Sequence, residues 1–318
     1  MHSEALAILA AAGYETGNVL LTPLPGGVSS EIHIAQIGSE RVVVKSALEK
    51  LRVASDWHSD PIRILAEGDA LRWFHCVTPH YVPDPIAITD SPPGLVIPYA
   101  PEPSVDWRTS LLSRITKSDV EITRQLRQIL TQWHSTSAKA LSGTRLDDTN
   151  RLRTLRLEPF YQDMATSLPE FNSVISDCIT ELLEQRTCMV HGDFSPKNVL
   201  LFEGGIWVLD AEVAHIGNPV LDYATMSAHL ILKALFYRDS PESSEIAQSM
   251  IEVFLDTESV DKLPATLSPH TGVFLGVRAI GRSPAQYLSS HQQLLALNIA
   301  KTLLAGATIQ EAVDTWLT

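Results

Sequence analysis

Short hydrophobic runs separated by glycine and proline occupy the first hundred residues of the chain. A helix is expected first, over residues 4–12. The runs that follow alternate apolar and polar positions and end at Pro-Gly-Gly and Gly-Ser sequences, which predicts antiparallel strands joined by tight turns. An Asp-Pro pair then starts a longer helix that reaches residue 76. The predicted strands cover residues 19–24, 31–37 and 41–45 before this helix, and residues 86–89 and 95–98 after it.

Helical patterns take over after residue 103. Three prolines between residues 98 and 103 make a stiff connection, so we expect a hinge there, between an N-terminal lobe of residues 1–97 and a C-terminal lobe of residues 104–318. In the next segment hydrophobic residues fall on one helix face, and Ser118 is the expected cap. Further helices are predicted over residues 170–185, 219–237, 242–255, 266–281, 291–304 and 308–317, with short strands at 188–190, 199–202 and 206–209.

Composition narrows the class of protein. The chain has 318 residues and carries 24 basic and 37 acidic side chains, a net charge of −13. Because this charge repels a phosphate backbone, we expect no nucleic-acid partner, and no apolar run is long enough to predict a membrane span. Cys76, Cys178 and Cys188 lack the paired spacing of a zinc site or a disulfide framework. Together with a first segment that lacks the basic stretch of a secretory signal, this favours a cytoplasmic location.

The densest polar motif is H-G-D-F-S-P-K-N at residues 191–198, followed by Asp210-Ala211-Glu212. A loop that leaves one short strand presents a carboxylate at Asp193 and an amide at Asn198, and the next hairpin presents a second acid. Such a set offers hard oxygen ligands for Mg²⁺ and a separate carboxylate to orient an attacking hydroxyl. Phosphoryl transfer is the chemistry that needs this combination.

This stretch resembles the catalytic loop H-G-D-x-x-x-x-N of the aminoglycoside phosphotransferase and choline kinase superfamily, distant relatives of protein kinases that phosphorylate small molecules. The resemblance implies that Asp193 is the catalytic base and that Asn198 and Asp210 hold Mg²⁺. It also implies that His191 braces the loop as scaffold. The alternative, that these aspartates are mere loop caps, stands beside this interpretation.

The same resemblance assigns residues of the N-terminal lobe to ATP. Lys45 ends a predicted strand, where a kinase-like fold places the lysine that contacts the α- and β-phosphates. Glu67 lies in the following helix, where such a fold places the ion-pair partner of that lysine. If Glu67 is exposed instead, it is one surface acid among many.

Two backbone segments complete the implied nucleotide site. The turn after the first strand would cover the phosphates, although a simple hairpin turn has the same composition. Residues 96–100 would bind adenine through their backbone. The residues expected to contact the nucleotide in these segments are Gly26, Gly27, Ser29, Ile97 and Tyr99.

The segment G-N-P-V-L-D-Y-A at residues 217–224 resembles the superfamily's G-D-P-x-x-D-L-A. The resemblance implies that Asp222 holds the catalytic loop from the start of a helix. Asn218 replaces the usual aspartate and is expected to cap that helix as well as aspartate would. His134 is expected to pack rather than to catalyse.

The acceptor is left open by the sequence. Asp210-Ala211-Glu212 resembles the Asp-x-Glu of methylthioribose kinases, which favours a sugar-like hydroxyl and places Glu212 near the substrate. Arg278 and Arg282 are four residues apart, are expected to share a helix face, and could bind a carboxylate or sugar hydroxyls. Exposed arginines on a helix are the alternative, and the acidic composition suits an aminated substrate equally well.

We therefore expect a two-lobed, kinase-like α+β fold, with a five-stranded antiparallel sheet and one main helix in the N-terminal lobe and a mainly helical C-terminal lobe. The expected activity is ATP- and Mg²⁺-dependent transfer of a phosphoryl group to a hydroxyl of a small molecule: an amino sugar, a sugar or an amino alcohol. A catalytically silent nucleotide-binding module is the main alternative. A metal-dependent phosphohydrolase would need more histidine and aspartate ligands than this motif offers.

Overall fold

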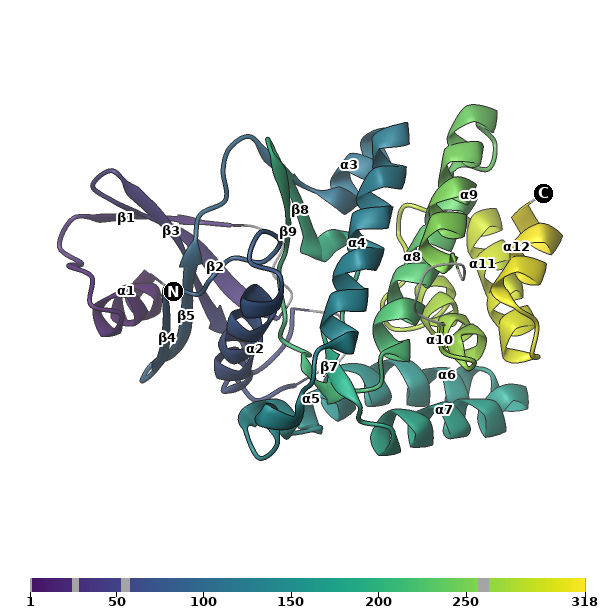
Figure 1. The fold of residues 1–318 in the computed structure, drawn as a ribbon, viewed down its shortest axis with the longest axis horizontal. Coiled ribbons are helices and arrows are strands. Elements are labelled where there is room, and N and C mark those ends of the chain that lie inside the picture. Colours follow the sequence, from purple (N-terminus) through teal and green to yellow (C-terminus); the bar gives the residue numbers. More distant parts are fainter. Residues whose placement is uncertain (1, 25–28, 53–57, 257–262, 318) are drawn as a thin grey trace.

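The computed structural model describes residues 2–24, 29–52, 58–256 and 263–317. Its N-terminal part is a five-stranded antiparallel sheet in the order β1-β2-β3-β5-β4 (Figure 1). This confirms the predicted strands and the helix between them, with ends that shift by up to three residues. The elements are α1 (His2–Ala11), β1 (Val19–Pro23), β2 (Ser30–Ile37), β3 (Glu40–Ala47), α2 (Arg63–Val77), β4 (Ala87–Asp90) and β5 (Pro93–Pro98).

The two faces of this sheet carry different helices (Figure 1). Val42, Val44 and Val96 pack with Ile8 of α1 in one hydrophobic cluster. Leu95 packs with α2 in a second, larger cluster. Because side chains alternate between the faces of a strand, Lys45 follows Val44 onto the α2 side, where it meets Glu67. The alternation of β3 thus places a lysine against a helical acid.

The C-terminal part is mainly helical, as predicted, with short strands around the polar motif (Figure 1). Its strands are β6 (Ser104–Asp106), β7 (Cys188–Val190), β8 (Val199–Phe202), β9 (Gly205–Val208) and β10 (His215–Gly217). Its longer helices are α3 (Trp107–Ser113), α4 (Lys117–Ser135), α7 (Asn172–Glu184), α8 (Val220–Tyr237), α9 (Pro241–Leu255), α10 (Leu267–Ala279), α11 (Ser290–Leu304) and α12 (Ile309–Leu317). Short α5 (Asn150–Leu152), a π-helical stretch (Arg153–Gln162) and α6 (Asp163–Ser167) form one further helical segment.

One expectation about a helix was wrong, and one helical segment was missed. The cap of α4 is Thr116 rather than Ser118, because the carboxylate of Asp119 accepts hydrogen bonds from the backbone N–H of Thr116 at 2.7 Å and from its hydroxyl at 2.9 Å. The helical segment between residues 150 and 167 was not predicted at all. It contains Pro159, and its wide π-helical turns do not produce the 3.6-residue period on which the prediction relied.

Helix α8 lies at the centre of the C-terminal part (Figure 1). It is buried from Val220 to Leu235 on every face, which explains why its sequence lacks a polar side. The large core cluster runs from α8 through α4 to α2 and Leu95, so α2 packs against both parts of the molecule. The boundary expected at residues 98–103 stays a prediction.

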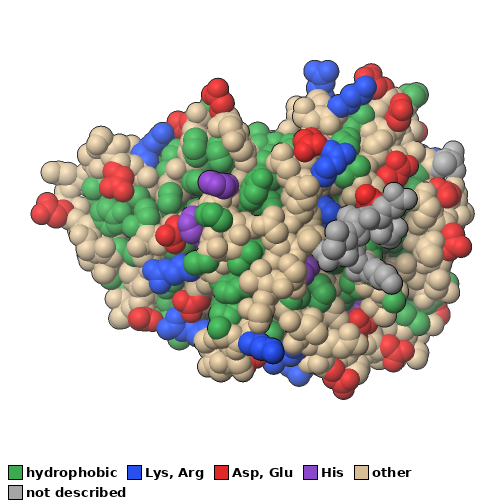
Figure 2. All heavy atoms as spheres, in the orientation of Figure 1, with side chains coloured by type: hydrophobic (Ala, Val, Ile, Leu, Met, Phe, Trp, Pro, Cys, Tyr) green, Lys and Arg blue, Asp and Glu red, His purple; other side chains and the backbone are tan. Residues whose placement is uncertain are grey.

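The surface agrees with the composition. Figure 2 shows acidic and basic side chains interspersed over the visible face. Among the described residues, no helix combines the length and hydropathy needed to cross a membrane.

Candidate active site

The loop of residues 191–198 leaves β7 through a turn that requires glycine. Gly192 has a φ of +77°, and a Cβ there would lie 2.7 Å from a Val213 side-chain carbon. The loop is fixed from the first turn of α8, where the Asp222 carboxylate accepts hydrogen bonds from the backbone N–H groups of His191 at 2.9 Å and Gly192 at 2.7 Å. His134 supports this carboxylate at 3.1 Å. Asp222 therefore makes the contacts that its expected structural role requires.

His191 connects the loop to the strand that precedes Asp210. Its ring is buried and lies parallel to that of Trp133, with 6.3 Å between centroids. Its Nε2 lies 3.1 Å from the carbonyl oxygen of Leu209. Burial lowers the pKa of His191 against the effect of Asp222. These contacts are those of a scaffold residue.

Asp193 is a buried carboxylate held between two cations. Arg156 lies 2.9 Å from Oδ1 and Lys197 lies 2.8 Å from Oδ2, while Asn198 Nδ2 donates to Oδ2 at 3.1 Å. Burial alone would raise the pKa of Asp193, but Arg156 and Lys197 outweigh it and hold the pKa well below its usual range. Asp193 is thus ionised at neutral pH and able to accept a hydrogen bond from a hydroxyl.

Lys45, Glu67 and Asp210 form a second buried cluster, which we call the lysine cluster. Lys45 Nζ lies 2.7 Å from Glu67 Oε1 and also contacts Asp210, 165 positions away in the chain. Burial lowers the pKa of Lys45, but Asp210, Glu67 and Glu212 raise it further, so the lysine is charged. Asp210 has a φ of +66°, a left-handed conformation that costs free energy outside glycine and is common at functional sites.

The donor set near these clusters fits Mg²⁺. Asn198 uses its amide nitrogen to donate to the Asp193 backbone at 2.9 Å, so its oxygen is the atom with which it would bind a cation. Asp210 supplies a carboxylate. Both are hard oxygen ligands of the kind that Mg²⁺ prefers. Within the described residues, no group of three or more His, Cys, Asp and Glu side chains is arranged around a metal position.

The residues expected to cover the nucleotide are only partly described. Gly26 and Gly27 lie outside the described residues. Ser29 is buried, and its carbonyl oxygen accepts from Arg63 at 2.5 Å. Ile97 lies in β5 opposite Val43. Tyr99 follows β5 and donates to Glu102. Contact of these residues with a nucleotide stays a prediction.

Glu212 is engaged within the protein. Arg63, at the start of α2, lies 3.2 Å from its carboxylate and also donates to the carbonyl oxygens of Ser29, Leu48 and Ser59. A substrate group would have to compete with Arg63 for this acid. No sequence pattern pointed to Arg63, which connects three segments of the N-terminal part to the segment after Asp210.

The two arginines proposed for the substrate do not share a helix face, so this expectation was wrong. Helix α10 ends at Ala279, and the chain turns at Gly281, where a Cβ would lie 2.8 Å from the Val277 backbone. Arg282 lies beyond the turn and pairs with Asp163 at 3.2 Å. Arg278 remains in the last turn of α10 and points to Ser283 and His229.

Sequence reasoning also missed the two cations beside Asp193. Lys197 belongs to the motif, four residues after Asp193, and that spacing was the available signal. Arg156 lies in the π-helical stretch and had no local signal. Its Nε also donates to the Gly192 backbone at 2.7 Å, so it fixes both the loop and the carboxylate.

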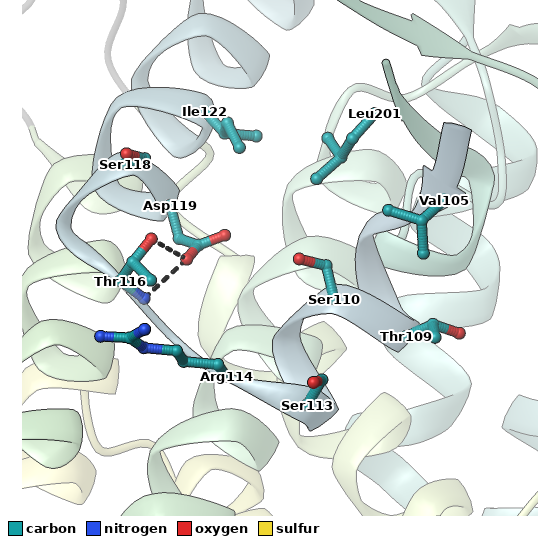
Figure 3. Close-up of a pocket in the computed structure, with 10 residues that line it drawn as sticks. All are labelled: Val105, Thr109, Ser110, Ser113, Arg114, Thr116, Ser118, Asp119, Ile122 and Leu201. Atoms are coloured by element: carbon teal, nitrogen blue, oxygen red, sulfur yellow. Dashed lines mark hydrogen bonds between the residues drawn. The ribbon is translucent and has the colours of Figure 1, made fainter. Parts of the chain in front are cut away.

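A separate cavity of about 520 Å³ lies between α3, the start of α4 and β8 (Figure 3). Its lining combines apolar Val105, Ile122 and Leu201 with short polar side chains. Asp119 faces it but is already bonded to Thr116 (Figure 3). None of the lining residues belongs to the catalytic loop or to the lysine cluster, so this cavity is not part of the site described above.

The model of the phosphotransferase enzyme family matches residues 21–247, and the chain belongs to this family. No curated protein matches.

A Ralstonia eutropha protein provisionally described as an aminoglycoside phosphotransferase is similar in structure, with a TM-score of 0.55, 13% identity and 98% of each chain covered. A spectinomycin phosphotransferase bound to ADP and spectinomycin has a TM-score of 0.52 at 10% identity, over 96% of this chain and 97% of that one. An amicoumacin kinase bound to AMP-PNP and Ca²⁺ has a TM-score of 0.52 at 14% identity, over 97% of both chains. These likenesses confirm the kinase-like α+β fold.

Proposed function

We propose that the chain is a small-molecule kinase that moves the γ-phosphoryl group of ATP to a hydroxyl. The observation that carries the proposal is the contact between Lys45 of β3 and Asp210, which lies one hairpin beyond the Asp193 loop. This contact joins a phosphate-binding cation to the acids of the catalytic loop. Family membership supports the general class, and the nucleotide complexes named above support ATP as the donor.

Each residue has a defined task in this reaction. Lys45 would bind the α- and β-phosphates, with Glu67 fixing its direction. Asn198 and Asp210 would hold Mg²⁺, which neutralises charge on the phosphates when bound. Asp193 would accept a hydrogen bond from the acceptor hydroxyl and align its oxygen with the γ-phosphorus. A new oxygen–phosphorus bond forms, the bond to ADP breaks, and the hydroxyl proton leaves through Asp193.

Asp193 is suited to orientation more than to strong base catalysis. Arg156 and Lys197 keep its pKa low, so it takes up a proton only as the hydroxyl oxygen becomes bonded to phosphorus. The side chain of Lys197 is 37% exposed, so it could also contact a phosphate of the nucleotide. Most of the rate enhancement would come from positioning and charge neutralisation.

The test is a coupled assay of ADP release with Mg²⁺-ATP and a panel of amino sugars, sugars and amino alcohols. We expect turnover with at least one hydroxyl acceptor, and loss of about a thousandfold or more in kcat for Asp193→Ala with nucleotide affinity retained. Nucleotide binding without turnover of any acceptor would instead support the catalytically silent module. An Asp193→Ala variant with wild-type turnover would overturn the assignment of the base.

A further inference from the structure

Two basic side chains, one buried and one half-buried, that form no ion pair within the described residues lie with a tyrosine near α8 and α10. The group comprises Lys233 of α8, Arg278 of α10 and Tyr287 of the loop after α10, and we call it the cationic pocket. Besides burial, the charge of Arg108 in α3 acts to lower the pKa of each of the three side chains. The net charge of the chain is negative, so a local excess of positive charge needs its own explanation.

Lys233 is the clearest case. Its side chain is 1% exposed, and in the part of the chain that the structure describes its Nζ has no hydrogen-bond partner. Nζ lies 3.8 Å from the centroid of the Tyr287 ring, and the Tyr287 hydroxyl is also buried without a partner. A buried ammonium group without a counterion is costly. Burial, Arg108 and Arg278 together lower the pKa of Lys233 to about 7.

Arg278 adds a second cation. Its Nη1 donates to Ser283 O at 3.1 Å and its Nη2 lies 3.5 Å from His229 Nε2, whereas its Nε is buried without a partner. His229 is one turn before Lys233 on the same face of α8, so Arg278, which contacts His229, lies near the same face of this helix as Lys233. Where the structure describes the chain, the hydrogen bonds of Arg278 go to Ser283 and His229 and not to a carboxylate.

The cationic pocket is continuous with the catalytic loop. The guanidinium groups of Arg278 and Arg156 lie 6.0 Å and 5.2 Å from the centroid of the same ring, Phe160. Arg156 in turn lies 2.9 Å from the Asp193 carboxylate. Arg278 and Asp193 also act on each other electrostatically. A molecule held in this pocket would therefore be close to the group that orients the acceptor hydroxyl.

We propose that the acceptor of this kinase is an alcohol that carries an oxyanion, a carboxylate or a phosphate, and that Lys233, Arg278 and Tyr287 bind this oxyanion. The inference rests on the proposed function and adds the substrate class. Lys233 Nζ, Arg278 Nε and the Tyr287 hydroxyl supply donors that no described residue uses. An aminated acceptor would meet repulsion from the same cations, which gives the site its selectivity.

The competing explanation is structural: Lys233 could stabilise the fold through its contact with the Tyr287 ring. The two explanations predict opposite effects on stability. If Lys233 awaits an anion, Lys233→Met removes a buried unpaired charge and raises the melting temperature of the unliganded protein by about 2 °C or more. If the contact is structural, the same change lowers it. Lys139→Met, at an exposed position in a short helical turn, is the matched control and should leave the melting temperature unchanged.

The first experiment compares hexoses that differ in charge: glucose, glucuronate, glucose 6-phosphate and glucosamine. Initial rates of ADP release are measured with saturating Mg²⁺-ATP. We expect the highest kcat/KM for an anionic member, and the carboxylate and phosphate arms tell the two oxyanions apart. For that acceptor, Lys233→Met and Tyr287→Phe should raise KM about 10- to 100-fold and about 3- to 10-fold, while Lys139→Met leaves it unchanged. A preference for glucose or glucosamine would overturn the proposal.

The second experiment does not depend on turnover. Melting temperatures are measured with ADP and Mg²⁺ present to fill the nucleotide site, with and without glucuronate or inorganic phosphate. Stabilisation of the wild type and of Lys139→Met, but not of Lys233→Met, supports the cationic pocket even if no hexose is phosphorylated. Absence of ADP binding would defeat the proposed function alone, whereas equal stabilisation of the wild type and Lys233→Met would defeat the anion site alone.

Discussion

The lysine cluster and the cationic pocket differ in whether the protein supplies a counterion for a buried lysine. In the lysine cluster, Lys45 is within bonding distance of both Glu67 and Asp210. In the cationic pocket, Lys233 has an aromatic ring for a neighbour and no described carboxylate. In the first arrangement the protein itself provides the counterions of the lysine, although Glu67 Oε2 is buried without a hydrogen-bond partner among the described residues. The second is incomplete, and a ligand can provide what is missing.

The comparison has a thermodynamic meaning. Removal of one member of a paired buried cluster leaves an uncompensated charge and destabilises the fold. Removal of an unpaired buried charge relieves an existing penalty and stabilises the fold at the expense of function. Stability measurements on the two lysine sites therefore distinguish a counterion held by the protein from one expected from a substrate.

The largest effect is expected for Glu67→Ala in the lysine cluster. This change leaves Lys45 paired with Asp210 but removes a buried charge-assisted hydrogen bond and empties the space of the side chain, and we expect a loss of about 3 kcal/mol in the free energy of unfolding. Chemical denaturation measures this loss, with Glu203→Ala at an exposed turn as the control. Glu67→Ala should therefore lower the stability of the fold, whereas Lys233→Met should raise it. A loss no larger than that of the control would show that Glu67 is not needed to balance Lys45.

A smaller effect is expected in the pH dependence of stability. The pKa of Lys233 is about 7 in the folded protein and near 10.5 when unfolded, so above pH 7 the unfolded chain binds the extra proton. Stability therefore rises with pH between these values, by at most about 1.4 kcal/mol per unit. The groups that face Lys233 are Arg108, Arg278 and Tyr287.

This pH dependence is measured as the difference in unfolding free energy between the wild type and Lys233→Met at pH 7 and pH 9. Other titrating groups are common to both proteins and cancel in the difference. We expect the wild type to gain about 2 kcal/mol relative to the variant over this interval. A difference that stays constant would mean that Lys233 keeps its proton in the folded state. It would contradict the claim that Lys233 is a buried cation without a counterion.

The sequence predicted the complete parts of the site better than the incomplete one. The catalytic loop is local: residues 191–198 carry their own turn and spacing, and Asp210 follows one hairpin later. Lys45 was found because a strand pattern ends at it. The cationic pocket draws Lys233, Arg278 and Tyr287 from separate elements, and no local pattern connects them. Nor could alternation along a strand reveal that Arg63 would form an ion pair with Glu212.

The fold shows the same division between local and long-range information. Strands and helices with a regular period were predicted with small errors at their ends, whereas the pairing of β3 with β5, which are far apart in the chain, had no local signal. The segment of residues 150–167 was missed because Pro159 and π-helical turns disguise it. That omission also hid Arg156, the cation closest to Asp193 from outside the motif.

The smallest predicted effect concerns Asn218, where pairing depends on an amide rather than a charge. Its oxygen accepts from the Val220 backbone at 2.9 Å, although Pro219 rather than Asn218 directly precedes α8, and its nitrogen donates to Glu181 Oε1 at 3.0 Å. Aspartate would keep the first bond but place a second carboxylate against Glu181, so asparagine suits this position better. Asn218→Asp should lower the unfolding free energy by about 1 kcal/mol, measured by chemical denaturation at pH 7. Adding Glu181→Gln should recover most of this loss, because the repulsion disappears while the bond to Val220 remains; a loss that persists in the double variant would place its origin in that bond itself.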